Sequence, residues 1–304
     1  MQCDDGMSAD RSPVVALLPS YAALFQAFHS PAAQSTSLGW TGQGDPSLLT
    51  GHTLLPVGLS EWMAVATHLP IVLLPHPIGS SATWLTAAVM GLTPDHNHCL
   101  NDQGQWLPPV QPTALRLLPF GLHPDSQQLL GYAAHSSCFG QGGGLMPLFS
   151  DTGQPTPALA QRRQRTEAFA ADLEAAAAAA AQLASMELLS PLPAHPDITL
   201  DPTLQRAMLI NAQALNQLSA STLQALHSLG LLGPAYGLQI AAMQLPRLQR
   251  LVKVMQQQKS QPQAAHGAFS SPQRRNQPQP AAAASGHAGG PRQPRDPITG
   301  QPLA

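Results

Sequence analysis

The stretch LPIVLLPHPIGSSATWLTAAVMGL, residues 69–92, decides the fold class of this chain. It contains two apolar runs, 69–74 and 84–92, each followed closely by a proline. Short apolar runs between turn-forming residues are typical of strands in an antiparallel sheet. The same pattern continues over residues 52–155, where charged residues are few. We therefore expect a region of short antiparallel strands that is covered on both faces or meets a partner.

A turn pattern inside this region predicts the position of one tryptophan in the fold. Residues 101–104 read NDQG, and Trp106 follows two positions later. Because Asn, Asp and Gly favour tight turns, the pattern predicts a strand after the turn, with the Trp106 ring in the core.

A long helix is predicted after the strands. Thr156 and Pro157 are residue types favoured at the N-cap and the first position of a helix. Helix formers, including a polyalanine segment, continue to Leu189. Pro191 and Pro193 cannot continue the helix, so it should end before them.

The C-terminal part, residues 200–250, alternates strand-like and helical patterns. A strand-like run at 207–211 turns helical, and Ser219 or Ser221 would cap a short helix that ends at Gly230. An apolar run at 231–236 and a last helix at 245–255 follow. The predicted class is therefore α+β: an antiparallel short-strand sheet region, then a long Ala-rich helix and a smaller strand-helix-strand-helix C-terminal part.

Composition divides the chain into three parts. Residues 1–50 mix an apolar patch with a polar segment and are expected to form a loosely ordered leader. Residues 51–255 carry the α+β pattern. Residues 256–304 are rich in Gln, Pro, Ala and Gly, with almost no large apolar side chain. Such a segment cannot bury enough area to offset the entropy of ordering, so we expect a disordered tail.

Composition also excludes several classes of protein. A formal net charge of -2 argues against a nucleic-acid partner. No run of eighteen apolar residues occurs, so no membrane span is expected. The start, MQCDD, lacks the basic residues of a secretory signal. We expect a cytoplasmic protein, with surface association by a route without a cleaved signal as the alternative.

The number and spacing of the cysteines do not indicate a disulfide framework. Cys3, Cys99 and Cys138 are odd in number and widely spaced. A single bridge between Cys99 and Cys138 is one interpretation, and packed thiols without a bridge are the favoured one.

The segment most similar to a metal site is DHNHC, residues 95–99, because these residue types ligate zinc. His96 and His98 would share one face of a strand, and Asp95 would join them from the turn, whereas Cys99 would point away. No second cluster such as CxxC accompanies them. We therefore expect a structural turn, with no catalytic residue, no cofactor and no metal. Asp95, His96 and His98 are the candidate ligands under the alternative.

Three further motifs fit structural functions better than chemical ones. The glycine-rich residues 140–144 run into Leu-Met-Pro and not into a helix with Lys and Ser or Thr, which favours a loop over a phosphate site. Cys138 and His135 lie on a loop whose spacing does not fix a Cys–His couple. Glu61 has no second carboxylate nearby in the sequence, which favours a helix-start residue over a general base.

The order of motifs over roughly residues 50–250 resembles the SapC family. Pro56-Val57, Glu61 and the run 69–73 are similar to that family's Pro-Val, Glu and Tyr-Pro-Ile-Val-Phe strand. Later matches follow in the same order, at residues 88–92, 97–106, 116–120, 147–153, 166–169, 188–189, 215–218 and 226–231.

Three departures from the family pattern bear on chemistry. Leu118 replaces the family's Tyr before Pro-Phe, and Leu117 replaces one of its paired arginines. Residues 241–246, AAMQLP, lack the His and Ser expected there, so any chemistry of that pair would be absent. The family takes its name from an association with bacterial surface-layer proteins, and the resemblance implies no established biochemical activity.

These observations predict a non-catalytic accessory or interaction protein of the SapC type, linked to the bacterial surface layer or its secretion, whose partner is another protein. The alternative is a metal-assisted enzyme of unknown substrate that uses Asp95, His96 and His98.

Overall fold

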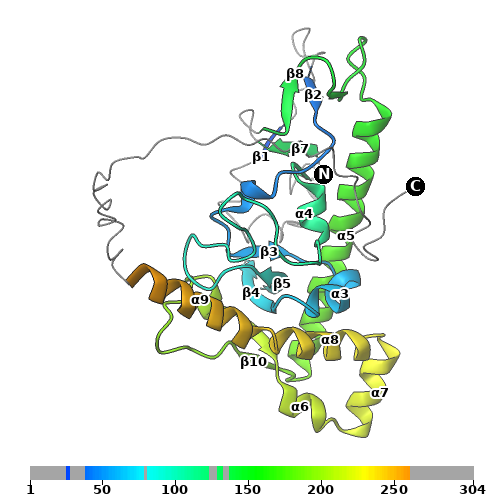
Figure 1. Cartoon of the computed structure of the whole chain (residues 1–304). Coiled ribbons are helices and arrows are strands. Elements are labelled where there is room, and N and C mark those ends of the chain that lie inside the picture. The colour runs from blue at the N-terminus through cyan, green and yellow to red at the C-terminus, as the bar shows by residue number, and fades with distance from the viewer. Residues whose placement is uncertain (1–24, 28–37, 79–80, 123–128, 133–136, 261–304) are drawn as a thin grey trace, which may run out of the picture. The chain divides into compact units, whose positions relative to one another are not determined.

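The computed structural model describes residues 25–27, 38–78, 81–122, 129–132 and 137–260 (Figure 1). All of them belong to the first of two units, Met1–Ser260 and Gln261–Ala304. The predicted tail lies outside the described residues from 261 onward, and so does most of the predicted leader. Within residues 38–50, Trp40 and Leu49 are buried. The three-part division of the chain stays a prediction.

A five-stranded antiparallel sheet organises the described residues, with strand order β10-β11-β4-β5-β3. Strands β4 and β5 pair along their length, from Ile71 opposite Ala88 to Ile78 opposite Ser81. The strands of this sheet are β3 (Leu54–Pro56), β4 (Ile71–Ile78), β5 (Ser81–Val89), β10 (Leu189–Pro191) and β11 (Met208–Ile210). The two apolar runs of residues 69–92 thus form neighbouring strands, as predicted.

Two smaller antiparallel sheets have three strands each. One has the order β1-β7-β6 and the other β8-β2-β9. Their strands are β1 (Phe25–Ala27), β2 (Leu38–Trp40), β6 (Phe120–Leu122), β7 (Leu129–Tyr132), β8 (Phe139–Gln141) and β9 (Met146–Pro147). The first two residues of the glycine-rich segment 140–144 end β8, and the other three form a loop that leads to β9 and not to a helix.

Most of the helical residues follow β9, in α5 and in α6 to α9, and the α+β class is confirmed. The α-helices are α3 (Trp62–Ala66), α4 (Thr113–Leu117), α5 (Pro157–Ser185), α6 (Ala212–Asn216), α7 (Ala220–Ser228), α8 (Leu232–Ala242) and α9 (Leu245–Ser260). Three short 3-10 helices are η1 (Pro46–Leu49), η2 (Leu59–Glu61) and η3 (Leu204–Arg206).

The long helix α5 begins as predicted and ends four residues earlier. The Thr156 side chain accepts a hydrogen bond from the Leu159 N–H, at the N-cap. At the other end the chain turns at Glu187, with φ of 56°, and the Leu188 N–H donates to the Leu183 carbonyl at 3.0 Å. This bond closes the helix in the manner of a Schellman cap, and the residues beyond it become β10.

Alternation along β4 assigns its side chains to two cores. Ile71 and Leu73 belong to the larger cluster, with Ala180 and Leu183 of α5. Val72 and Leu74 belong to the second cluster, on the opposite face of the sheet, with Leu245, Leu248 and Val252 of α9. Helices therefore cover the sheet from both sides, which is why the strands carry almost no charge.

The apolar run at 231–236 is helical and not a second strand of the C-terminal part. It opens α8, in whose first turn Gly233 and Pro234 lie. Proline is tolerated there because the first N–H groups of a helix need no intrahelical partner. Ala235 and Leu238 then pack into the larger core cluster. Four helices, α6 to α9, therefore follow β11.

Trp106 lies beside the turn, as predicted, but its ring is only partly buried. Leu100 and Trp106 form an isolated antiparallel bridge around the turn, in which Gly104 has φ of 74°. The indole N–H donates to the Val110 carbonyl at 2.8 Å. The ring packs against the edge of the larger cluster. The fully buried tryptophan of this core is Trp62.

Candidate functional site

The predicted ligand segment, residues 95–99, forms a turn held by its own backbone and by Asn97. The His98 N–H donates to the Met90 carbonyl at 2.8 Å. Asn97 accepts from the Cys99 N–H at 2.9 Å and donates to the Leu49 carbonyl at 2.9 Å. These contacts hold the turn in place.

The turn brings His96 and His98 together, and it leaves Asp95 exposed. The two imidazole rings lie 5.2 Å apart. His98 Nδ1 lies 3.1 Å from the Met255 sulfur of α9. In the described part of the chain, no group of three or more His, Cys, Asp or Glu could hold a metal ion. The structural function of the turn stays a prediction, which metal analysis can test.

The two histidines give the first test. The His96→Asn/His98→Asn variant should fold with a free energy of unfolding within about 1 kcal/mol of wild type, because the turn is held by other groups. Purified wild-type protein should retain no zinc through dialysis. A His227→Asn variant, changed on the exposed surface of α7, serves as control. One equivalent of zinc in the wild type and the control, but none in the double variant, would establish a metal site instead.

The cysteines Cys99 and Cys138 form no disulfide with each other. They are buried in different clusters, Cys99 in the larger core and Cys138 beside Trp40 and Phe120. Burial raises the pKa of the Cys99 thiol to about 12, although Arg247 acts in the opposite direction. Cys99 is therefore protonated at neutral pH, which does not suit a nucleophile. His135, the possible partner of Cys138, lies outside the described residues.

Glu61 holds the starts of two helices, which confirms its expected function. One carboxylate oxygen accepts from the Gly58 N–H at 3.2 Å, before η2. The other accepts from the Thr113 N–H at 2.7 Å and from the Thr113 hydroxyl at 2.9 Å, at the start of α4. Both oxygens are thus engaged by structural donors, which is not the environment of a general base.

A second carboxylate, which the sequence did not indicate, supports the same segment from α5. Asp172 accepts from the Ser60 N–H at 3.0 Å and from the Ser60 hydroxyl at 2.7 Å. The two residues are 112 positions apart. Glu61 and Asp172 together fix residues 58–61 at the start of α3, so both carboxylates have structural tasks.

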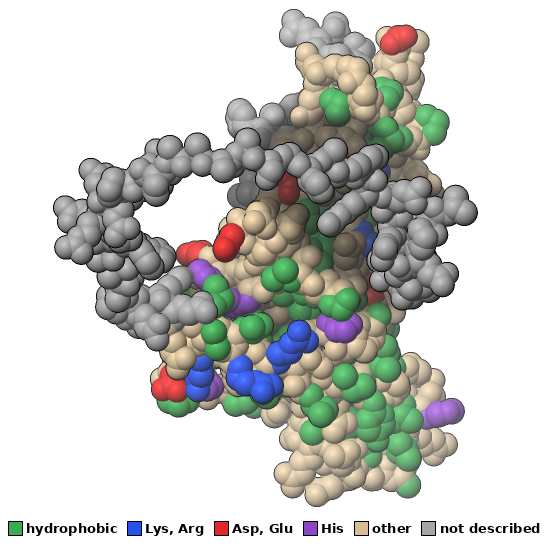
Figure 2. Space-filling model, in the orientation of Figure 1, with side chains coloured by type: hydrophobic (Ala, Val, Ile, Leu, Met, Phe, Trp, Pro, Cys, Tyr) green, Lys and Arg blue, Asp and Glu red, His purple; other side chains and the backbone are tan. Residues whose placement is uncertain are grey.

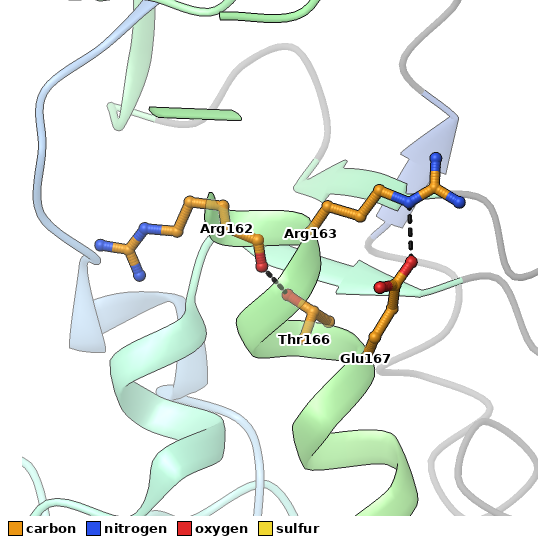
Figure 3. A network of polar contacts seen from close by, with 4 residues as sticks. All are labelled: Arg162, Arg163, Thr166 and Glu167. Atoms are coloured by element: carbon orange, nitrogen blue, oxygen red, sulfur yellow. Dashed lines mark hydrogen bonds and ion pairs between the residues drawn. The ribbon is translucent and has the colours of Figure 1, made fainter. Parts of the chain in front are cut away.

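Arg162 joins the start of α5 to the smaller sheets. Its guanidinium lies over the Trp40 ring, 4.2 Å from the centroid, and donates to the Arg116 carbonyl at 3.0 Å. Burial lowers the pKa of Arg162. Figure 3 shows the Thr166 hydroxyl donating to the Arg162 carbonyl and Arg163 paired with Glu167 at 2.7 Å on another side of the helix. The cation–π contact makes this arginine a packing residue.

The remaining candidate is a surface formed by α8 and α9. Apart from the adjacent pair Arg250 and Leu251, their outward positions follow one another in steps of three or four residues, and we call this set the α8–α9 stripe. It consists of Tyr236, Ile240, Met243, Arg247, Arg250, Leu251 and Val254. All are exposed, and Met243 is the most exposed of the apolar ones at 73%. On the face shown in Figure 2, hydrophobic side chains lie over α8 and basic ones over α9.

The sequence pattern covers part of the stripe, in the apolar run 231–236 and the helix predicted at 245–255, but it omits Ile240 and indicates no surface. The pattern predicts the helix at 245–255 but not α8, so it does not indicate that one surface extends over both helices. The signal was nevertheless present in the spacing of the buried residues, which are Leu231, Ala235, Leu238, Ala241, Leu245, Leu248 and Val252. These also follow one another in steps of three or four, on the inner side of the same rod.

Comparisons with known proteins show the family. The family model described as SapC matches residues 33–248, more than half of the chain. No curated protein and no solved structure matches. In the part of the chain that the structure describes, no helix is long and apolar enough to cross a membrane. The matched residues include the five-stranded sheet, α5 and α8, and the chain belongs to the SapC family.

Proposed function

We propose that this protein is a non-catalytic accessory protein of the SapC type that acts by binding another protein. The α8–α9 stripe is the observation that carries the proposal. Soluble proteins rarely expose contiguous apolar surface without a binding function. Tyr236 and Ile240 of α8 and Met243 at its C-cap lie at positions i, i+4 and i+7, and all three are exposed. Tyrosine and methionine are also enriched at protein interfaces.

The packing beneath α8 supports a rigid surface. Gly237 lies against the Met63 side chain of α3, since a Cβ at this glycine would be 2.5 Å from the Met63 sulfur. Leu238 and Ala241 are buried in the larger core cluster. A helix fixed in this way presents its outer residues with little loss of conformational freedom on binding, which favours affinity.

The proposed setting follows from family membership. The link to the bacterial surface layer or its secretion rests on the association from which the SapC family takes its name. The protein would act in the cytoplasm, or reach the surface by a route without a cleaved signal. The alternative, a metal-assisted enzyme, is supported by the proximity of His96 and His98 and is tested by the zinc measurement above.

Cross-linking in the bacterium that encodes the chain tests the proposal. A photoreactive phenylalanine analogue at position 243 should form one discrete adduct with another protein. The same analogue at Gln164, an exposed position of α5, is the matched control and should not form it. Ile240→Asp should abolish the adduct at position 243, because a charge would be buried in the interface. Absence of an adduct, or an adduct with a second copy of the chain alone, would contradict the proposal.

A further inference from the structure

Charge is distributed unevenly along the chain. No Asp or Glu occurs between Asp201 and Asp296. Five basic residues lie in 202–260, namely Arg206, Arg247, Arg250, Lys253 and Lys259. The other nine basic residues and all sixteen acidic ones lie elsewhere, so the part that contains α6 to α9 is basic in a chain of net charge -2. This separation points to a partner of opposite sign.

The α8–α9 stripe is one continuous feature and not two separate helix faces. Met243, between the helices, keeps right-handed helical angles of -68° and -15°. The Arg247 and Leu248 N–H groups both donate to the Gln244 carbonyl, in the first turn of the next helix. Figure 1 shows α8 and α9 following one another along one side. From position 236 to position 254 a helical rod extends roughly 27 Å.

The arginines of the stripe have no acidic partner in the described structure. The ion pairs found there are Arg163 with Glu167 and Lys253 with Asp197. Arg250 donates to the Pro246 carbonyl at 3.3 Å, within its own helix. Arg247 and Arg250 are exposed and lie one helical turn apart, beside Leu251 and Val254. Two positive charges among apolar side chains are thus presented outward.

We infer that the α8–α9 stripe binds an acidic amphipathic helix of the partner protein. The inference rests on the proposed function and specifies the partner's chemistry. Side chains at i, i+4 and i+7, continued by further steps of three and four, match the anchor spacing of a helix that packs along another. Carboxylates on such a helix would pair with Arg247 and Arg250, and its apolar side chains would cover Tyr236, Ile240 and Met243.

Two other occupants fit the stripe less well. In a second copy of this chain, a parallel pair of rods would place arginines against arginines, and like charges in contact are unfavourable. An antiparallel pair would place the arginines over Ile240 and Met243 of the other copy, which offer no carboxylate. An anionic membrane attracts basic residues near its surface, and the binding grows with their number. Two such residues give weak binding, and the inner side chains Leu245, Leu248 and Val252 belong to the core and cannot enter lipid.

Peptide selection tests the inference with defined reagents. A library of random 18-residue peptides, displayed on a surface, would be selected against the full chain. Enriched peptides should carry an excess of Asp and Glu, with apolar residues at steps of three and four. Their affinity should fall at least about tenfold in Arg247→Glu/Arg250→Glu and should weaken with salt, since exposed charges are screened. Arg163→Glu/Arg165→Glu makes the same change in net charge on α5 and should bind like wild type.

Three results would overturn the inference. The first is enrichment of neutral or basic peptides, and the second is equal loss of affinity in both charge-reversed variants. The third is binding of the wild type, but not of Arg247→Glu/Arg250→Glu, to vesicles of phosphatidylglycerol and phosphatidylcholine, which would indicate a membrane surface.

Cross-linking at position 243 separates the two proposals. If the adduct persists in Arg247→Glu/Arg250→Glu, a protein partner binds but not through an acidic helix, so only the inference is wrong. If no adduct forms in the wild type, the proposed function itself is wrong.

Discussion

Replacement of Trp62 by alanine should destabilise the protein by about 3–5 kcal/mol, the usual cost of removing a fully buried aromatic ring. Trp62 has no exposed surface and is the largest side chain in the larger core cluster. It begins α3, directly after the segment that Glu61 and Asp172 hold. Urea unfolding, followed by circular dichroism, measures the change through the midpoint and the slope of the transition.

Two other variants show whether burial of the ring is the cause. The Trp62 indole N–H is buried and forms no hydrogen bond in the described structure. Trp62→Phe removes this costly donor and keeps a ring, so it should lose less than half as much as Trp62→Ala. Trp106→Ala should also cost less, about 1–2 kcal/mol, because its ring is only partly buried. A larger loss for Trp106→Ala than for Trp62→Ala would contradict the assignment of the core.

Local chemistry explains why several helix ends could be predicted. Thr156 caps α5 through the Leu159 N–H, and Ser219 caps α7 through the Thr222 N–H at 3.1 Å. Gly230, with φ of 69°, follows the end of α7. Each of these caps is formed by residues within a few positions of one another. The local sequence is therefore enough to predict it.

Tertiary packing decided the elements that could not be predicted. The run 231–236 is short and apolar, and periodicity alone does not separate a strand from a buried helix segment of this length. Burial of Ala235 and Leu238 against the larger core resolves the ambiguity in favour of α8. The end of α5 also depends on tertiary contacts. Residues 189–191 pair with β11 as strand β10 and so do not continue the helix.

The candidate sites show the same division between local and distant effects. The spacing of His96 and His98 predicted a shared face, and their rings do lie together. The capping function of Glu61 was also foreseeable, since Gly58 is three residues away. Its bonds to Thr113 and the contact of Asp172 with Ser60 join residues 52 and 112 positions apart. No pattern in a single sequence predicts such pairs.

Gly91→Ala should destabilise the protein by about 3 kcal/mol or more. Gly91 follows β5, and a Cβ there would overlap the carbonyl oxygen of His96. The obstacle is backbone and not the end of a flexible side chain, so the turn that carries the histidines would have to move away. Its movement would break the hydrogen bond from the His98 N–H to the Met90 carbonyl and disturb those from Met90 and Gly91 to Thr53.

Hydrogen exchange and a matched glycine separate this local cause from a general effect of alanine. The amide of His98 should exchange faster in Gly91→Ala even below the unfolding transition, because its hydrogen bond is the first to be lost. Gly51→Ala, at an exposed glycine with no atom near the added Cβ, should stay within about 0.5 kcal/mol of wild type. If Gly91→Ala is as stable as Gly51→Ala and His98 keeps its protection, the close approach of the two backbones is wrong. If both effects appear, Gly91, which lies in the segment 88–92 that resembles the family, has a packing function, since only a residue without a side chain lets the histidine turn lie against the sheet.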